Sequence, residues 1–410
     1  MLQELRCATL GHSTFKTSVI SDLIQVRRSV TLVALLGTAC GRDPVPPGEA
    51  QVRERWFVTQ SQGFPNPRPV VSGATAFFAS GSGFVIARDV ETGDLKWSTQ
   101  IGVSKYSVSS EIGGENFILR GGILVTAVQF HTSALDANTG RELWRYEAPL
   151  DTVEHANPRP GYVQRARIDA DDQTVFIPAW GASVSAVDLQ TGQTRWVWPV
   201  EPTLGHRSGS MGVRLSGDTV FATVWHSLNL TGTQGEAWLL ALDRLSGREL
   251  WRVILPKLSS GTTANDAPAI WHNLVYVTMT SGDLYAINRE TQQIAWHIPT
   301  QISPSGIGAA LISGPEVYED FVYANGSDMK LHAYRAADGV EVWASEGGQV
   351  VNDLLITSKF VYASNGATLY ILDRASGKQY AMPGHPRHSY RLRVHLSCCR
   401  WRQLDLHNSH

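Results

Sequence analysis

One short phrase recurs seven times along the chain and constrains its fold more than any other feature. It reads as a small residue, a hydrophobe, Asp, two variable residues, Thr or Ser, Gly, and then Trp four residues after the glycine. Four copies keep the Asp, the Thr or Ser, the Gly and the Trp, and three later copies keep part of the phrase: residues 87–97, 134–144, 186–196 and 241–251, then 286–296, 333–343 and 371–380. Successive tryptophans of the phrase lie 45 to 55 residues apart. That period is the length of one four-stranded propeller blade.

Ahead of each copy of the phrase lies a run of β-branched and aromatic residues. Residues 174–178 (TVFIP) are typical, and similar runs occupy residues 75–79, 122–127, 219–224, 274–278, 321–324 and 360–363. Such runs favour β-strands. A Gly, Ser or Asn turn follows most of them and leads into a strand that ends at the Asp of the phrase, as in consecutive hairpins. The sequence therefore predicts an all-β chain of antiparallel strands.

The phrase itself predicts a turn followed by the outer strand of a blade. An Asp side chain at its start accepts hydrogen bonds from backbone N–H groups two and three residues on, and Gly adopts a positive φ at low cost. The Trp then packs its large face on the neighbouring blade. Because the acidic residues hold a fixed place in a turn, we interpret the whole set as structural and not catalytic. The set comprises Asp89, Gly93, Trp97, Asp136, Gly140, Trp144, Asp188, Gly192, Trp196, Asp243, Gly247, Trp251, Trp296 and Trp343.

The phrase and its spacing resemble the quinoprotein-type repeat of the PQQ-like β-propellers, over roughly residues 52–380. The resemblance implies a ring of four-stranded antiparallel blades. Seven sets of strands predict seven blades, and an eighth would have to come from the C-terminal segment. In such propellers an N-terminal strand commonly completes the last blade, so the resemblance implies that the strand around Trp56 closes the ring.

Composition excludes several classes of function. Lys and Arg number 35 against 37 Asp and Glu, so no net positive field exists to attract nucleic acid. The four cysteines are Cys7, Cys40, Cys398 and Cys399, which leaves residues 41–397 without a disulfide or a thiolate metal site. The histidines fall about once per blade without a shared ligand spacing, and we predict no metal site.

The N-terminal segment predicts export. Arg27 and Arg28 precede a short apolar run and small residues that end at Cys40, which is the order found in a secretory signal. A cysteine at that place resembles a bacterial lipoprotein signal, with Cys40 as the lipidated residue. Gly37 stands where such signals favour Leu, so an ordinary cleaved signal and a short membrane anchor remain alternatives.

These features divide the chain into four parts. Residues 1–40 form an N-terminal extension and leader, residues 41–51 a Pro- and Gly-rich tether, and residues 52–384 the propeller. Residues 385–410 are rich in Arg, His and Cys and lack the phrase, so we predict a disordered or non-native tail. The predicted location is the periplasmic face of the outer membrane, or the cell surface, of a bacterium.

The resemblance also raises quinone chemistry as a hypothesis. Quinoprotein dehydrogenases carry a calcium ligand set, an Asp base and, in many cases, two adjacent cysteines against the cofactor. Here the adjacent pair is Cys398 and Cys399, which lies beyond the last repeat instead of among the early blades. We therefore predict no cofactor and no catalytic residues, with PQQ and calcium as the alternative.

Loops that enter the innermost strands are the second place for a site, because they line one mouth of a propeller's channel. Their polar residues predict candidate contacts for a small molecule or an ion: His155, Asn157, His206, Arg207, Asn265, Asp266, Ser305, Asn352 and Asp353.

An exported, tethered propeller without a catalytic set resembles the BamB family of outer-membrane assembly lipoproteins. That resemblance implies a non-enzymatic scaffold that binds protein partners of an outer-membrane assembly complex. It also implies a lipid anchor in place of a transmembrane span. The alternative is a quinoprotein-like dehydrogenase or a small-ligand-binding propeller that uses the channel-mouth loops.

Overall fold

The computed structural model describes most of the predicted propeller and a few short strands outside it. The described residues are 14–16, 57–59, 69–79, 83–101, 112–128, 131–151, 159–160, 167–179, 183–199, 208–227, 235–256, 266–299, 314–326, 328, 330–346, 353–364, 368–380, 390–391, 394–395 and 400–401. Cys40 and Trp56 lie outside these residues. No helix with the length and apolar character required to span a bilayer occurs in the described part of the chain.

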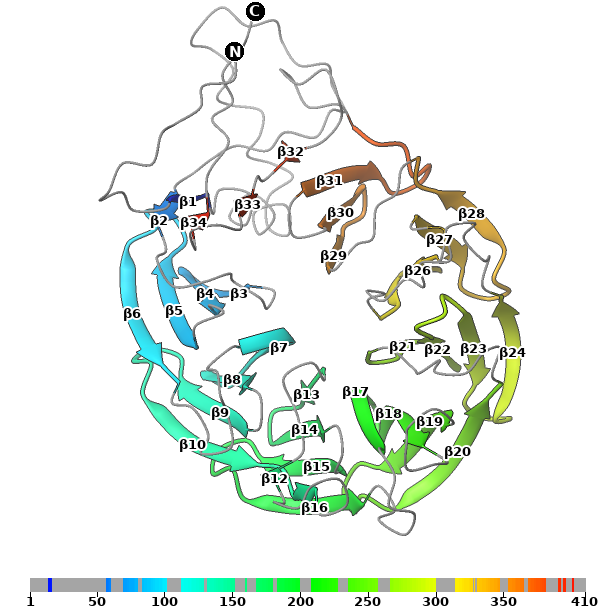
Figure 1. Cartoon of the computed structure of the whole chain (residues 1–410), viewed down its shortest axis with the longest axis horizontal. Helices are drawn as coiled ribbons and strands as arrows, with labels where there is room; N and C mark the ends of the chain where they lie inside the picture. The colour runs from blue at the N-terminus through cyan, green and yellow to red at the C-terminus, as the bar shows by residue number, and fades with distance from the viewer. Residues whose placement is uncertain are drawn as a thin grey trace, which may run out of the picture.

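Seven four-stranded antiparallel sheets stand around a central axis, each with its first strand innermost (Figure 1). Blades 1 to 4 are β3 (Val70–Ser72), β4 (Thr75–Ala79), β5 (Phe84–Asp89), β6 (Leu95–Gln100); β7 (Ile112–Arg120), β8 (Ile123–Val128), β9 (His131–Asp136), β10 (Glu142–Glu147); β13 (Asp169–Ala170), β14 (Thr174–Ala179), β15 (Ser183–Asp188), β16 (Thr194–Pro199); and β17 (Ser208–Ser216), β18 (Thr219–Ser227), β19 (Gly235–Asp243), β20 (Glu249–Leu255). Blades 5 to 7 are β21 (Ala269–Trp271), β22 (Leu274–Thr278), β23 (Leu284–Asn288), β24 (Gln293–Ile298); β25 (Glu316–Tyr318), β26 (Phe321–Asn325), β27 (Leu331–Arg335), β28 (Glu341–Ala344); and β29 (Asp353–Ile356), β30 (Phe360–Ser364), β31 (Thr368–Asp373), β32 (Tyr390–Arg391). A small ribbon of β11 (Leu150–Asp151) and β12 (Arg159–Pro160) follows blade 2 in the chain. The prediction of seven four-stranded antiparallel blades is confirmed.

The runs expected to be strands form the second strand of each blade, and these strands are almost entirely buried. β14 and β22 are buried along their whole length. Their side chains alternate between the two neighbouring blades, so both faces of each central strand are apolar. The hydrophobic core is therefore divided into separate clusters, one at each interface from blades 1 and 2 to blades 6 and 7.

The turn between the third and fourth strands has the predicted geometry. Asp89 Oδ1 accepts hydrogen bonds from the N–H groups of Glu91 at 2.9 Å and Thr92 at 3.1 Å. The N–H of Gly93 donates to the Asp89 carbonyl at 2.9 Å, and Gly93 has a φ of 76°. Corresponding bonds hold the turns at Asp136, Asp188, Asp243, Asn288 and Asp373.

After each turn, a β-bulge sets the direction of the tryptophan. In blade 3, Trp196 pairs with Ala186 while Thr194 pairs with Val187, so Arg195 between them has no partner on β15. The same register shift occurs beside Trp97, Trp251, Trp296 and Trp343. A bulge re-aims the side chains that follow it.

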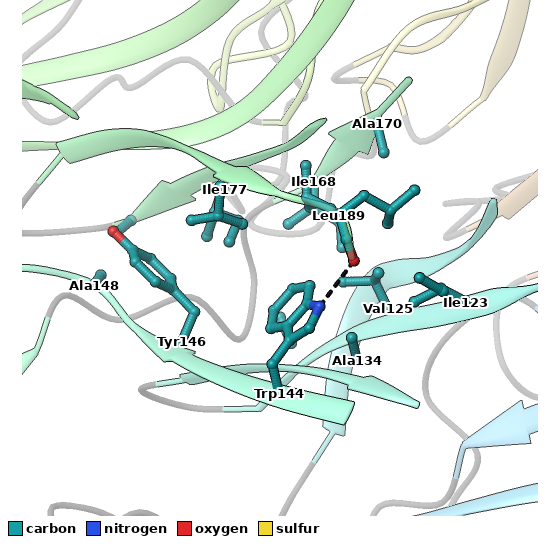
Figure 2. Packing of buried hydrophobic residues seen from close by; sticks show 14 residues of the cluster. Ile123, Val125, Ala134, Trp144, Tyr146, Ala148, Ile168, Ala170, Ile177 and Leu189 are labelled. Carbon is teal, nitrogen blue, oxygen red and sulfur yellow. Dashed lines mark hydrogen bonds between the residues drawn. The ribbon is translucent and has the colours of Figure 1, made fainter. Parts of the chain in front are cut away.

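Each tryptophan packs on the turn of the next blade, as predicted. Trp144 of β10 donates its indole N–H to the carbonyl of Leu189 in blade 3 at 2.8 Å (Figure 2). Its ring lies against Gly192, where a Cβ atom would stand 2.7 Å from Trp144 Cδ2. The glycine is thus required twice, once for the positive φ of the turn and once for the close approach of the ring. The same contact joins Trp97 to Gly140, Trp196 to Gly247, Trp296 to Gly339 and Trp343 to Gly377.

The weaker copies of the phrase keep this packing more often than the sequence suggests. Trp296 and Trp343 both pack against a glycine of the next blade, although the copies of the phrase to which they belong are incomplete. The departure lies in blade 5, where Gln292 takes the place of the glycine below Trp251 and holds a φ of 61°. In blade 7, Tyr380 packs within its own blade, because its ring contacts Phe360 at 5.2 Å and its hydroxyl donates to Asp373 at 3.2 Å.

The expectation that the strand after Trp56 completes the last blade is wrong for the described residues. β2 (Phe57–Thr59) pairs with β1 (Thr14–Lys16), and the outer place beside β31 belongs to β32. An open sheet edge accepts whichever strand reaches it, and here the C-terminal segment does. Two further strands of that segment, β33 (Val394–His395) and β34 (Arg400–Trp401), pair with each other.

Replacing Gly192 by Ala tests the double role of the glycine. The new Cβ would meet the Trp144 ring and also disfavour the positive φ, so Gly192→Ala should lower the free energy of unfolding by about 2–4 kcal/mol. Gly73→Ala is the matched control, since Gly73 also has a positive φ but nothing within 4 Å of its Cβ position. It should cost only about 1 kcal/mol. Equal losses in urea denaturation would show that the ring contact contributes nothing.

Candidate functional site

The segments that enter the inner strands of blades 3 to 6 are joined to one another along the channel. Arg167, just before β13, pairs through its backbone with β17 of the next blade. Its N–H donates to the Met211 carbonyl and its own carbonyl accepts from the Val213 N–H, both at 3.0 Å. The inner edge of blade 3 is therefore hydrogen-bonded to that of blade 4.

Blades 4, 5 and 6 are linked in the same way around Asp266. The Thr223 hydroxyl of β18 donates to the Asp266 carbonyl at 2.6 Å. The Gly314 N–H, ahead of β25, donates to Asp266 Oδ2 at 3.0 Å. Gly212 of β17 lies so close to Ala267 that a Cβ atom would stand 2.2 Å from the Ala267 nitrogen. Only glycine fits at that crossing.

An ion pair joins the two ends of this row of segments. Arg167 Nη2 lies 2.7 Å from Glu316 Oε1, and the two side chains are 12% and 22% exposed. Arg167 belongs to blade 3 and Glu316 to blade 6, so the pair passes the inner side of blades 4 and 5. We call the four linked segments and this ion pair the inner ring. Its two charged side chains, Arg167 and Glu316, are paired with each other.

The predicted channel-mouth residues fall mostly outside the described part of the chain. His155, Asn157, His206, Arg207, Asn265, Ser305 and Asn352 all do. Asp353 begins β29, but its side chain is not described. Asp266 is the described member, and it lies in the inner ring. These residues remain predictions as a binding site.

Asp266 itself acts as a tie between blades. Its φ is 120°, a region that costs a residue other than glycine about 1–3 kcal/mol. Its Oδ1 accepts from the Ala267 N–H at 2.6 Å while Oδ2 accepts from Gly314. The inter-blade bonds hold the strained backbone in place. Loop position suggested a ligand-binding role from the sequence, whereas the contacts are with backbone N–H groups of the protein.

The carboxylates of the inner ring do not form a set that fits calcium and a quinone. Asp169 accepts the N–H groups of Ala170 and Leu215, both at 2.8 Å. Glu316 faces Arg167, and Asp266 faces backbone N–H groups. A calcium ion requires several oxygen ligands directed at one point. Among the described residues, no group of three or more His, Cys, Asp or Glu side chains is placed to hold a metal ion.

Two further histidine clusters were not anticipated from the sequence. His297 contacts the buried Asp283 at 2.8 Å and stacks on Tyr285. His332 lies between Asp328 at 2.9 Å and Glu341 at 2.8 Å. Each cluster is assembled from hairpin pairs within one blade, and the spacing of histidines along the chain gave no signal of it. They belong to different blades and do not converge on a shared reaction centre.

His131 is a fully buried histidine whose pKa is strongly altered by its surroundings. It begins β9 on the side facing blade 1 and has no exposed surface. Neither ring nitrogen has a hydrogen-bond partner in the described structure, and the nearby Thr126 hydroxyl also lacks one. Burial lowers the pKa of His131 to about 4, with a smaller lowering from Arg145 and an opposing effect of Glu142. His131 is therefore neutral at pH 7.

This histidine should make the fold sensitive to mild acid. Its pKa is lower in the folded chain than the usual 6.5 of the unfolded chain, so protonation favours unfolding. Its effect is absent above about pH 7 and grows as the pH falls from 6.5 to 4, where it removes about 3 kcal/mol of stability. His131→Phe, with His131→Gln as a second non-titrating variant, should flatten that part of the profile in urea denaturation. Parallel profiles for the variants and the natural protein would contradict the assignment.

The Arg167–Glu316 pair should couple blades that are not neighbours. A double-mutant cycle with Arg167→Met and Glu316→Gln should give a coupling energy of about 1–2 kcal/mol, since both side chains are largely shielded from water. The exposed pair Arg145–Glu142, at 3.0 Å, is the control and should give no more than about 0.5 kcal/mol. Equal coupling in the two cycles would mean that the inner ring adds nothing to the ion pair.

Comparison with known proteins agrees with this architecture. The family described as outer membrane protein assembly factor BamB matches residues 48–296 and 235–389. BamB of Xanthomonas campestris pv. campestris is 23% identical over 365 residues, covering 80% of this chain and 82% of that protein. A polyvinylalcohol dehydrogenase from a Pseudomonas species is 26% identical over 232 residues, which cover 53% of this chain but only 31% of the relative.

Solved structures share the fold at low identity. The crystal structure of BamB from Moraxella catarrhalis aligns with a TM-score of 0.58 at 16% identity, over 78% of this chain and 87% of that one. A europium-containing methanol dehydrogenase aligns with a TM-score of 0.62 at 14% identity, over 79% and 77%. The structures support the propeller alone, whereas the family match spans nearly the whole propeller. The chain belongs to the BamB family of PQQ-like repeat β-propellers.

Proposed function

We propose that this protein is exported in a bacterium, anchored at the outer membrane through Cys40, and acts there as a non-enzymatic scaffold for protein partners in outer-membrane protein assembly. The observation that carries the proposal is the similarity to an outer membrane protein assembly factor over about four fifths of both chains. The family match, over residues 48–296 and 235–389, includes every blade and not a single repeat. This extent supports a role like that of the family for the whole propeller.

The contacts of the inner ring support a scaffold over an enzyme. Its carboxylates are occupied by backbone N–H groups and by Arg167, and its backbone is locked between neighbouring blades. A catalytic group has to be poised for a substrate, with its proton affinity adjusted to the reaction. The described side chains of the channel are instead committed to holding the ring together. Binding then falls to the outer surfaces and the loops.

The leader supports the location. A basic pair, an apolar run and small residues before Cys40 fit a lipoprotein signal, and residues 41–51 are long enough to separate a lipid anchor from the first blade. Cys40→Ser should release the protein from the membrane fraction into the soluble periplasmic fraction. If the variant stays with the membrane, the anchor is not a lipid on Cys40.

Complementation tests the scaffold role. In a bacterium whose own BamB gene is deleted, producing the full chain should raise the amount of folded β-barrel protein in the outer membrane. The Cys40→Ser chain, made at the same level, is the control and should restore less. Correct localisation of the full chain without any gain in β-barrel protein would overturn the proposed role.

The second candidate function is a quinone-dependent dehydrogenase. It is favoured by the similarity to a polyvinylalcohol dehydrogenase, which covers about half of this chain. The described carboxylates do not supply a calcium site for it, so the ligands would have to come from outside the described residues. Dye-linked oxidation of alcohols by the purified full chain, dependent on added PQQ and calcium, would support this function and exclude a purely structural role.

A further inference from the structure

A hollow of about 430 Å³ opens between blades 1 and 2, on the face that carries the turns of the repeated phrase. Blade 1 contributes Ser72, Phe77 and Trp97, and blade 2 contributes Gly122 and Ala137. At the equivalent place between other pairs of neighbouring blades, side chains of the protein fill the space. One position is shared by all seven blades.

That position is the residue directly after the Asp of the phrase, or after Asn288 in blade 5 and Arg335 in blade 6. Its backbone N–H donates to the turn between the first two strands of its own blade, as Ala137 does to Gly122 at 2.8 Å and Arg289 to Asn273 at 2.9 Å. In five blades its carbonyl accepts the indole N–H of the preceding blade, as Ala137 does from Trp97 at 3.0 Å. The seven residues are Val90, Ala137, Leu189, Arg244, Arg289, Ala336 and Arg374.

In three blades this residue is an arginine that reaches back to the preceding blade. Arg244 lies 3.5 Å from Asp171, and Arg374 lies 2.9 Å from Glu319 with its guanidinium over the ring of Tyr318. Arg289 donates to the hydroxyl of Ser216 at 3.0 Å. A guanidinium therefore fills this junction repeatedly, on an acidic, aromatic or hydroxyl partner.

Other junctions are filled by side chains of complementary size. Between blades 2 and 3, Leu189 packs with Ile118 in one apolar cluster. Between blades 5 and 6 the residue at this position is the small Ala336, which lies in one apolar cluster with the large Trp271 of the preceding blade. In the described structure, these junctions are closed by the chain itself.

Between blades 1 and 2, the residue at this position and the residue that ends the first strand of the preceding blade are both small. Ala137 and Ser72 both line the hollow, and Ser72 ends β3 just as Ser216 ends β17. The hydroxyl that accepts from Arg289 in one junction is thus kept in the other, whereas the arginine is missing. Lys96 also lines the hollow but does not replace the arginine, because its ammonium donates to the Ala74 carbonyl and the Thr75 hydroxyl and pairs with Asp89.

We propose that this hollow is a socket for a guanidinium group, supplied by an arginine side chain of a partner protein. Ser72 and the side-chain oxygen of Asn138 are the hydrogen-bond acceptors, and Trp97 and Phe77 provide the aromatic wall to which a planar cation is attracted. The partner's arginine would take the place that Arg244, Arg289 and Arg374 take in their own junctions. The site does not depend on the scaffold role proposed above.

Supplying the arginine from the chain itself is the first test. Ala137→Arg should fill the hollow and raise the melting temperature by about 2 °C. Ala336→Arg is the matched control, because Trp271 already occupies that junction, and it should lower the melting temperature. If Ala137→Arg is also destabilising, the hollow does not accept a guanidinium and the proposal fails.

Binding in solution is the second test. N-acetyl-arginine amide added to the ¹⁵N-labelled full chain should shift the indole N–H signal of Trp97 saturably, with a Kd on the order of 1 mM for a ligand of this size. N-acetyl-citrulline amide has the same shape without the charge and should bind at least about tenfold more weakly. The Ala137→Arg chain should lose the response. A Trp97 signal that does not saturate, or that responds equally to both compounds or in the filled variant, overturns the proposal.

Discussion

The contact between an indole ring and a glycine turn is the interaction on which the ring of blades depends. A propeller has no central core, so each sheet must be held by its two neighbours. The tryptophan supplies both parts of that attachment, a large apolar face and one directed hydrogen bond. The indole face packs closely only on a residue without a Cβ atom. The indole N–H needs a backbone carbonyl at a fixed distance from that residue. The Asp-capped turn provides both at once, which explains why Asp, Gly and Trp recur together.

Much of this arrangement was predictable from the sequence. The capping role of Asp89 and its counterparts, the strand runs such as residues 174–178, and the packing of Trp144 on the next blade follow from composition and spacing. The second reason for the glycine was not predictable, because it depends on a tryptophan ring that lies 34 to 51 residues away in the sequence, in another blade. Ring closure was misjudged for a related reason. Which strand takes an open edge is decided by chain geometry at the two ends, and a sequence pattern carries no information about it.

The candidate site shows a similar limit. Asp266 was identified as a polar loop residue, but its role as a tie follows from the Gly314 N–H and the Thr223 hydroxyl that meet it. Arg167 and Glu316 stand 149 positions apart and outside the repeated phrase, so nothing in the linear pattern associates them. His131 was one of many histidines spread along the blades. Its unusual state comes from burial between two sheets, which only the packing of blade 1 on blade 2 produces.

The differing junctions after the motif Asp have a consequence for how the chain encodes the order of its blades. A repeat protein made of identical units could assemble with a unit skipped or two units exchanged, because every interface would accept every other. Here a blade that offers Trp271 matches a follower with Ala336, whereas one that offers Asp171 matches a follower with Arg244. If the two following blades were exchanged, Arg244 would be buried against the indole of Trp271. The carboxylate of Asp171 would then face the methyl group of Ala336. The side chains at each junction thus favour the native neighbour of each blade. They make the packing of a blade against the wrong neighbour during folding unfavourable.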